Sequence, residues 1–283
     1  MNLSQSVDLH CHSNLSDGKL SPKELTELMH QKNVKLFSLT DHDTTAGCAD
    51  AEKLSKKLGM LFIPGVEISS KHLDKSLHIL GLGIDQSNSE LQDFLAENRT
   101  IRRDRQEQIL SRLEHFDINI REEIEDFTDQ QSPGRSHFAE ALVKKSYAEN
   151  KGEAFRKYLI KGGAAYVNTP WPDMKKVITK IHSAGGQAVL AHPGRYGYSL
   201  PGLRGLFRQF RDAGGDGAEV SSGPQALGVV QRLSQLCNKF GLKVSGGSDF
   251  HDPASLWVKA GEYQQIPKRL TRIWQEMGWY QGA

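Results

Sequence analysis

Candidate metal-binding side chains begin close to the start of this sequence. His10 and His12 stand two residues apart in the apolar segment VDLHCH, so both imidazoles point to the same face of a strand. Two imidazoles on one face can converge on a metal ion, whereas Cys11 between them points the other way, into the core. Asp17 follows in a turn with Gly18, where an aspartate is either a ligand or a turn-forming residue.

Further candidate ligands stand at or near the ends of later apolar segments. They are His42, which follows the segment ending at Leu39, and then Glu67, His78, His192, Asp249 and His251. Because the carboxyl ends of parallel strands share one rim of a barrel, we expect these side chains to meet there. Mixed imidazole and carboxylate ligands suit Mn²⁺, Zn²⁺ or Fe²⁺ better than Mg²⁺ or Ca²⁺. Asp41 and Asp43 either orient His42 or cap the following helix.

The segments that would position these ligands alternate between strand and helix patterns. Strands are expected at 7–12, 35–40, 61–68, 76–84, 187–193, 217–222 and 242–249. Helices are expected from the capping box at Ser21 onward, and at 46–58, 173–184, 202–213 and 224–240. This alternation predicts an α/β fold with a mostly parallel sheet, closed into a barrel.

Residues 88–163 interrupt this alternation with charge-rich, helix-forming sequence and no convincing strand. We therefore expect a barrel domain made of 1–87 and 164–283, and a helical insertion at 88–163 that caps the site and binds substrate. The tail at 264–283 predicts one short helix, with Ile273, Trp274 and Met277 packed on the barrel.

Composition excludes several classes of protein. The chain has 283 residues with 36 Lys and Arg against 34 Asp and Glu, so no global charge draws it to nucleic acid or to membranes. Three widely spaced cysteines argue against a disulfide framework and fit a reducing compartment. No apolar run approaches the roughly 20 residues that span a bilayer, and no signal peptide is recognisable. We expect a cytoplasmic protein with no obligate protein partner.

The motifs also carry a family resemblance. HCHSNLSDG, TDHDT, PGVEIS, the segment around His78, AHP and GSDFH occur in this order and resemble the motifs of the PHP (polymerase and histidinol phosphatase) superfamily of metal-dependent phosphoesterases. The resemblance implies the PHP fold, a distorted (β/α)7 barrel. The long insertion between His78 and His192 is similar to that of one bacterial subgroup. Its members hydrolyse the 3′-phosphate of nucleoside 3′,5′-bisphosphates, and related members of the RNase AM type trim RNA from a 5′-monophosphate end.

The resemblance also implies a site with three divalent ions, for which Mn²⁺ is the first expectation and Zn²⁺ or Fe²⁺ are alternatives. In the implied arrangement, His10, His12, Glu67 and Asp249 hold one ion, Asp17, His42 and His251 a second, and Glu67, His78 and His192 a third. Every ligand position of the family pattern is present. The implied reaction is in-line attack on phosphorus by a metal-bound hydroxide, without a covalent enzyme intermediate.

Candidate substrate-binding residues lie in the insertion. Arg99, Arg102, Arg103 and Arg105 crowd one helix pattern, with the first three and Gln106 on a common face. This face is either solvated surface or a phosphate clamp. A second candidate is PGRSH at 133–137, a Gly-Arg turn opening a helix whose N-terminus favours anions. The predicted substrate contacts are Arg102, Arg103, Arg135 and His137, and His137 is also the candidate general acid.

We therefore expect a metal-dependent phosphoric-ester hydrolase, with small nucleotides, RNA 5′ ends or both as its partners. The expected activities are those of a nucleoside 3′,5′-bisphosphate phosphatase, of a 5′–3′ exoribonuclease that releases 5′-mononucleotides, or both. The alternatives are a histidinol-phosphate phosphatase and a non-catalytic PHP scaffold module. Glu219 stands at a strand end but is left out of the predicted site, and Trp171 and Trp257 are interpreted as core or surface cover.

Overall fold

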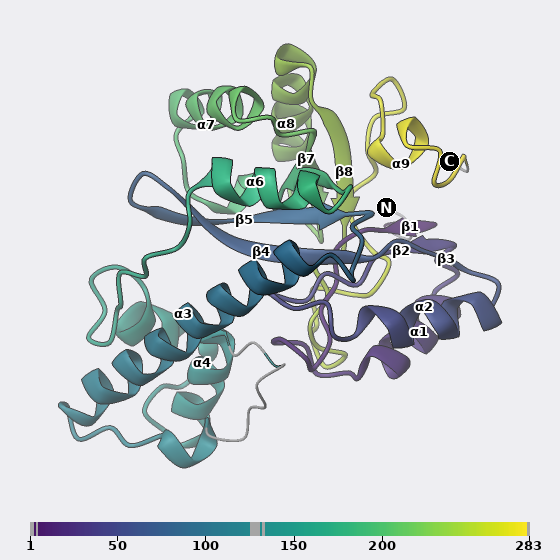
Figure 1. The fold of residues 1–283 in the computed structure, drawn as a ribbon. Coiled ribbons are helices and arrows are strands. Elements are labelled where there is room, and N and C mark those ends of the chain that lie inside the picture. Colours follow the sequence, from purple (N-terminus) through teal and green to yellow (C-terminus); the bar gives the residue numbers. More distant parts are fainter. Residues whose placement is uncertain (1–2, 4, 125–130, 132–133, 282–283) are drawn as a thin grey trace.

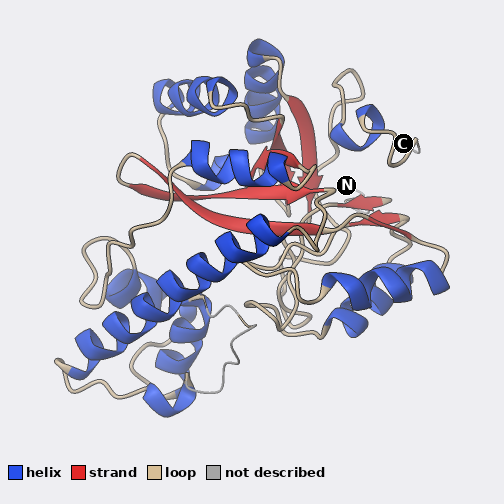
Figure 2. Ribbon diagram, viewed as in Figure 1, coloured by secondary structure: helices blue, strands red, loops and turns tan. Residues whose placement is uncertain are grey.

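The computed structural model describes residues 3, 5–124, 131 and 134–281, and in this part of the chain the strands form two sheets (Figures 1 and 2). The smaller sheet is parallel, in the order β1 (Val7–Asp8), β2 (Leu36–Phe37), β3 (Leu61–Phe62). The larger sheet has the order β4 (Gly65–His72), β5 (Lys75–Leu82), β6 (Gln187–Leu190), β7 (Gly217–Ser222), β8 (Lys243–Gly247).

The expected closed barrel is not found among the described residues. The chain forms a mixed α/β fold with two open sheets, and isolated bridges between His42 and Glu67 and between Cys11 and Phe250 link their edges. The sheet is also not uniformly parallel, because β5 is antiparallel to both β4 and β6. The reason is local: only Leu73 and Asp74 connect β4 to β5, and such a short turn permits only antiparallel pairing.

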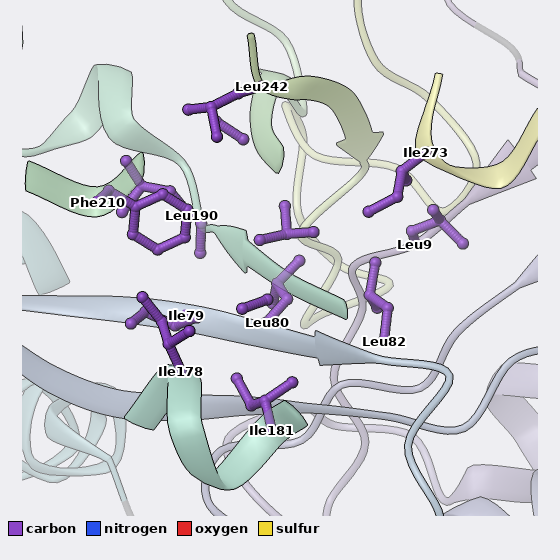
Figure 3. Packing of buried hydrophobic residues seen from close by; sticks show 14 of the residues in the cluster. Leu9, Ile79, Leu80, Leu82, Ile178, Ile181, Leu190, Phe210, Leu242 and Ile273 are labelled. Carbon is purple, nitrogen blue, oxygen red and sulfur yellow. The ribbon is translucent and has the colours of Figure 1, made fainter. Parts of the chain in front are cut away.

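Helices cover the sheets as the apolar periodicity predicts. They are α1 (Pro22–Gln31), α2 (Cys48–Lys57), α6 (Met174–Ser183), α7 (Leu200–Asp212) and α8 (Leu227–Phe240). The capping box of α1 is confirmed, since Ser21 accepts a hydrogen bond from the Glu24 amide and Glu24 accepts one from the Ser21 amide. Figure 3 shows Ile178 of α6 beside Ile79 of β5 and Phe210 of α7 beside Leu190 of β6, and Ile181 of α6 packs over Gly81 of β5.

The segment between β5 and β6 is helical, and its described part contains no strand. Its elements are α3 (Ser89–Glu114), a 3₁₀ turn (Arg121–Glu123), α4 (Arg135–Lys144), α5 (Lys151–Ala154) and a π-helical turn (Phe155–Leu159). The first half of α3 packs on the main core, whereas its second half forms a separate apolar core with α4 (Figure 1). Residues 125–127 of the expected helical sequence and Pro133 lie outside the described residues.

The tail forms the expected short helix, α9 (Ile273–Glu276). Ile273 and Trp274 are buried in the main core, as expected, whereas Met277, expected to pack beside them, is 37% exposed and is not among the residues of that core. The three cysteines are free thiols and all are buried. Across the described residues, no helix has the length and apolar character needed to cross a membrane.

Candidate metal centre

The structure brings all nine predicted ligands together, where the two sheets approach each other. Six of the eight strands contribute: β1, β2, β6 and β8 are each followed by their ligands, whereas β4 and β5 carry theirs within the strand. The contributions are His10, His12 and Asp17 after β1, His42 after β2, Glu67 in β4, His78 in β5, His192 after β6, and Asp249 and His251 after β8. The two-sheet arrangement therefore assembles the same set of side chains that a shared barrel rim predicts.

Glu67 lies at the centre of the cluster and is 1% exposed. Its Oε1 is 3.0 Å from His78 Nδ1 and 2.8 Å from His192 Nε2, and its Oε2 is 3.0 Å from His42 Nδ1. A carboxylate whose two oxygens face different imidazoles can bridge two cations. This geometry agrees with the bridging role that the family resemblance implies for Glu67.

His10 and His12 lie between Glu67 and Asp249. Their Nε2 atoms are 3.1 Å apart, and both lie 3.3 Å from Asp249 Oδ1. The same two nitrogens lie 3.4 Å and 3.3 Å from Glu67 Oε2. Two imidazole nitrogens and two carboxylate oxygens therefore converge on one point.

Asp17 gathers the other side of the cluster. Its Oδ1 is 3.2 Å from His251 Nε2, 3.7 Å from His42 Nε2 and 3.8 Å from His12 Nδ1. His12 therefore neighbours this group as well as Glu67 and Asp249, a link that the implied three-ion arrangement does not contain.

The chemistry of the cluster fits divalent metal ions. Asp17 Oδ1, His42 Nδ1 and His78 Nδ1 are buried and have no hydrogen-bond partner, although each lies close to another electronegative atom of the cluster. Lone pairs that face one another without a shared proton are the arrangement that a metal ion satisfies. Burial also lowers the pKa of His42 to about 4, which keeps this imidazole neutral and able to ligate.

The charge of the cluster supports the same conclusion. Burial opposes protonation of His12, yet the nearby carboxylates of Asp249 and Glu67 raise its pKa to about 10. Although burial alone would raise the pKa of the Asp17 and Glu67 carboxyls, the neighbouring imidazoles hold both values well below the usual range. The buried carboxylates therefore attract positive charge into this space, which either protons or metal cations can supply.

Two of the candidate ligands have backbone conformations that side-chain-bearing residues rarely adopt. Asp249 has φ 53° and His192 has φ 29°, both in the left-handed region. Hydrogen bonds hold them there: the Asp249 amide donates to the His10 carbonyl at 2.7 Å, and the His192 amide donates to a Glu219 oxygen at 2.7 Å. Such strained positions concentrate at functional sites, where the surrounding structure compensates for their cost.

Glu219 supports the cluster from behind, a role that the sequence analysis missed. Its carboxylate is fully buried and both oxygens lie 3.0 Å from His10 Nδ1. When Nδ1–H donates to this carboxylate, the lone pair of His10 Nε2 faces the other ligands. The available signal was a carboxylate in the middle of the buried segment GAEVSS, where an unpaired charge is costly.

We predict that Glu219→Ala weakens metal binding by about 10- to 100-fold, because His10 loses the partner that fixes its tautomer and orientation. Glu219→Gln should weaken metal binding less than Glu219→Ala does, since its amide oxygen still accepts the hydrogen bond from His10 Nδ1–H. Calorimetric titration of the metal-free protein with Mn²⁺ measures the affinity of both variants. Equal affinity of Glu219→Ala and the unchanged protein would contradict this role.

Two further residues position ligands. Arg195, in the 3₁₀ turn η3 (Pro193–Arg195), forms an ion pair with Asp249 Oδ2 and donates to the Ser222 carbonyl at 3.0 Å. Asp41 accepts hydrogen bonds from the Ser13 amide at 2.7 Å and from Ser16 Oγ at 2.6 Å, which fixes the loop behind His12. Asp41 therefore orients the ligand loop and does not cap α2, whose N-terminus has no side-chain cap.

Asp43 does not orient His42 but anchors α3. It accepts hydrogen bonds from Arg102 Nε at 2.6 Å and from Asn98 Nδ2 at 2.8 Å. Arg102 Nη2 also donates to Ser69 Oγ at 2.6 Å. Because Arg102 and Asp43 are both buried, this ion pair fixes α3 directly beside the metal cluster.

The arginines of α3 and α4 share a cavity with the cluster. The cavity has a volume of about 210 Å³, and its lining includes seven of the candidate ligands together with Arg102, Arg105, Arg135, Trp171 and Arg195. Arg103, a predicted contact, is exposed and does not line the cavity, whereas Arg105 does. The reason is helical geometry, since three residues beyond Arg102 return to nearly the same face and one residue does not.

These arginines form a cationic wall. Burial, and then repulsion from Arg135 and Arg102, hold the pKa of Arg105 well below its usual range. Burial followed by repulsion from Arg102 likewise lowers the pKa of Arg135. Arg105 Nε is buried without a hydrogen-bond partner, and the guanidinium lies 6.0 Å from the ring centre of Trp171. Poorly compensated cations at a cavity wall indicate an anionic ligand.

His137 lies in the first turn of α4 but is not part of the cavity lining. Its Nδ1 accepts a hydrogen bond from the Gly134 amide at 3.1 Å and so caps the helix. Ser136 in the same turn donates to Asp17 Oδ2 at 3.1 Å, which connects α4 to the cluster. His137 therefore shapes the turn that presents Arg135, and its roles as a substrate contact and general acid stay predictions.

Comparison with known proteins gives a consistent picture. Residues 8–189 match the family model described as PHP domain. The chain is 35% identical to a 5′-3′ exoribonuclease of Haemophilus influenzae, covering 97% of this chain and 100% of the relative. It is also 35% identical to a 3′,5′-nucleoside bisphosphate phosphatase of Chromobacterium violaceum, covering 96% of each chain. A solved structure, described as an amidohydrolase from Chromobacterium violaceum with bound sulfate and no metal, superposes with a TM-score of 0.90, covering 96% of each chain at 35% identity.

Proposed function

The chain belongs to the PHP domain family of metal-dependent phosphoesterases, and from this premise we propose that it hydrolyses the 3′-phosphoester of 5′-phosphorylated nucleotides. Its substrates are nucleoside 3′,5′-bisphosphates, RNA with a 5′-monophosphate, or both. The observation that carries the proposal is a single cavity with the ligand cluster on one wall and Arg102, Arg105 and Arg135 on another.

We propose that the cluster holds three divalent ions, with Mn²⁺ first and Zn²⁺ or Fe²⁺ as alternatives. His10, His12, Glu67 and Asp249 would hold one ion, Asp17, His42 and His251 another, and Glu67, His78 and His192 the third. Bound divalent ions activate water and neutralise negative charge on phosphoryl oxygens. The mixed imidazole and carboxylate donors support this choice of metals.

The residues of the chain itself would select and hold the substrate. Arg105 and Arg135 bind the 5′-phosphate, and Arg102, fixed by Asp43, adds positive charge between that phosphate and the cluster. Arg195 compensates the charge of Asp249 at the opposite wall. In this proposal, the helical insertion at 88–163 is the cap that binds the 5′ end.

One arrangement accounts for both activities. With the 5′-phosphate held by the arginines, the phosphoester on the 3′ oxygen of the same nucleotide lies at the cluster. The group beyond the cleaved phosphorus is either a hydrogen or the rest of an RNA chain. A bisphosphate then yields a 5′-mononucleotide and phosphate, whereas RNA loses one 5′-mononucleotide at each cut.

The other functions considered have less support. A histidinol-phosphate phosphatase has no evident use for three arginines facing its ligand cluster, and a scaffold module is not expected to keep all nine ligands. A cytoplasmic location and the absence of an obligate protein partner stay predictions.

The proposal is tested with a short RNA that carries a 5′-monophosphate, incubated with the protein and Mn²⁺ beside the same RNA with a 5′-hydroxyl. We expect stepwise release of 5′-mononucleotides from the phosphorylated RNA alone, and phosphate release from adenosine 3′,5′-bisphosphate in a parallel assay. Hydrolysis of the bisphosphate without cleavage of RNA would restrict the function to small nucleotides. Inactivity on both substrates would refute the proposal.

A further inference from the structure

The loop that follows the last two candidate ligands presents two large apolar side chains to solvent. Leu256 is 83% exposed and Trp257 is 81% exposed, the two highest values among the large apolar side chains of the described residues. Of the two alternatives that the sequence left open for Trp257, core or surface, the structure supports the surface position. A neighbouring pair of exposed apolar side chains beside a ligand cluster indicates a contact surface for a ligand.

This loop borders a hollow that continues from the metal centre. The hollow has a volume of about 780 Å³ and lies between the loop and the start of α5, where Asn150 and Lys151 form its far wall. Asp249 and His251 line both this hollow and the cavity of the arginines. None of the cavity's arginines lines the hollow within the described residues. The candidate metal centre therefore separates a cationic cavity from an apolar hollow.

The loop is anchored, so its exposed ring has a defined place. Ser255 Oγ accepts a hydrogen bond from the Val258 amide at 3.0 Å, and the Ser255 carbonyl accepts one from Lys259 Nζ at 2.5 Å. Phe250 before the loop and Ala260 after it are each 1% exposed and belong to the same apolar core. Trp257 thus projects from a loop whose two ends are fixed. Because the loop is already anchored, less conformational entropy is lost when a ligand binds to it.

We propose that Trp257 is the stacking platform for the nucleobase that follows the cleaved phosphate of an RNA substrate. This inference rests on the proposed function, because the arginines define which side of the cluster receives the 5′ end. The chain that continues beyond the cleaved phosphorus then leaves past His251 into the hollow. An exposed indole binds any base through its π face, as expected of an enzyme that removes nucleotides regardless of sequence.

The proposal separates the two substrate classes. A nucleoside 3′,5′-bisphosphate ends at the phosphorus that the cluster attacks, so it has no base to place on Trp257. A 5′-phosphorylated dinucleotide has one such base. Trp257 therefore contributes to the cleavage of RNA and not to the hydrolysis of bisphosphates.

The test compares kcat/KM of the unchanged protein, Trp257→Ala and Trp257→Phe, with Mn²⁺, on three substrates. These are adenosine 3′,5′-bisphosphate, the 5′-phosphorylated dinucleotide pApA, and the same dinucleotide lacking its second base. We expect Trp257→Ala to lower kcat/KM on pApA by about tenfold. The same variant should match the unchanged protein on the bisphosphate and on the abasic dinucleotide. Trp257→Phe should keep most of the activity on pApA, because its ring can still stack. Leu256→Ala, which removes an equally exposed but non-aromatic side chain, is the matched control and should lose less than twofold on pApA.

The other outcomes are distinguishable. If the unchanged protein hydrolyses neither the bisphosphate nor pApA, the proposed function itself fails. If it hydrolyses both but Trp257→Ala loses activity equally on all three substrates, or on none, the stacking platform is overturned. A change of Trp257→Ala from oligomer to monomer in light scattering, with an equal loss on all substrates, would show that the surface binds a second copy of the chain.

Discussion

Replacing Glu67 by glutamine is expected to lower turnover by roughly 1,000-fold and to release metal from the protein. Glu67 is the carboxylate that faces His42, His78 and His192 within 3.0 Å, and it is almost fully buried. The amide has nearly the same shape but no negative charge, so it cannot balance the cations that the cluster is proposed to bind. Metal content after dialysis, measured by mass spectrometry, and phosphate release from adenosine 3′,5′-bisphosphate test both parts of this prediction.

The matched control is Glu90→Gln, which makes the same chemical change at a glutamate of α3 that is 66% exposed. It should leave metal content and turnover unchanged. The melting temperatures of Glu67→Gln and of the unchanged protein should be compared in excess chelator. Under this condition metal binding does not contribute to the stability of either one, so the comparison reports the effect of the substitution on folding alone. Full metal content together with full activity in Glu67→Gln would exclude this residue from the centre.

The second large effect is expected at Arg105. Arg105→Met should reduce kcat/KM on adenosine 3′,5′-bisphosphate by about 30-fold, mainly through KM, since charge-assisted hydrogen bonds to the 5′-phosphate are lost. Activity on adenosine 3′-monophosphate, which has no 5′-phosphate, should stay the same. The ratio of the two kcat/KM values measures the preference for a 5′-phosphate and should fall by the same factor of about 30.

Arg105→Met should not destabilise the protein. The guanidinium is surrounded by Arg102 and Arg135 and its Nε has no hydrogen-bond partner, so its removal relieves repulsion while methionine keeps the apolar contacts. We expect an unchanged or higher melting temperature. Arg103→Met is the control on the same helix, because Arg103 is exposed outside the cavity and its loss should leave the ratio unchanged. An unaltered ratio in Arg105→Met would remove this residue from the binding site.

The ligand cluster could be predicted from the sequence because each ligand lies within or soon after a recognisable apolar segment. Histidines and carboxylates that recur at strand ends require only that the ends meet, and this holds for the two open sheets as it does for a barrel. The closed barrel itself was a wrong expectation. The deciding feature was the two-residue connection at Leu73 and Asp74, which makes β5 antiparallel to its neighbours.

The supporting residues could not be predicted because their partners are distant in the sequence. Glu219 and His10 are 209 residues apart, and Arg102 and Asp43 are 59 apart. A helix pattern alone also does not show which face of the helix meets the cavity. Arg103 was therefore predicted as a substrate contact, whereas the residue of this helix that lines the cavity beside Arg102 is Arg105. The exposure of Trp257 depends on how the loop after Asp249 is anchored, and no periodic pattern describes such a loop.

The contact between Asp43 and Arg102 has a consequence for the size of the product. Asp43 is the residue next to His42, so the arginine of the cap is tied to the chain one peptide unit away from a proposed metal ligand. In the proposed function, a buried ion pair and one peptide unit would therefore fix the position of the cap relative to the point of cleavage. A fixed spacing of this kind would let the enzyme cut after the first nucleotide at every step, whatever the length of the RNA.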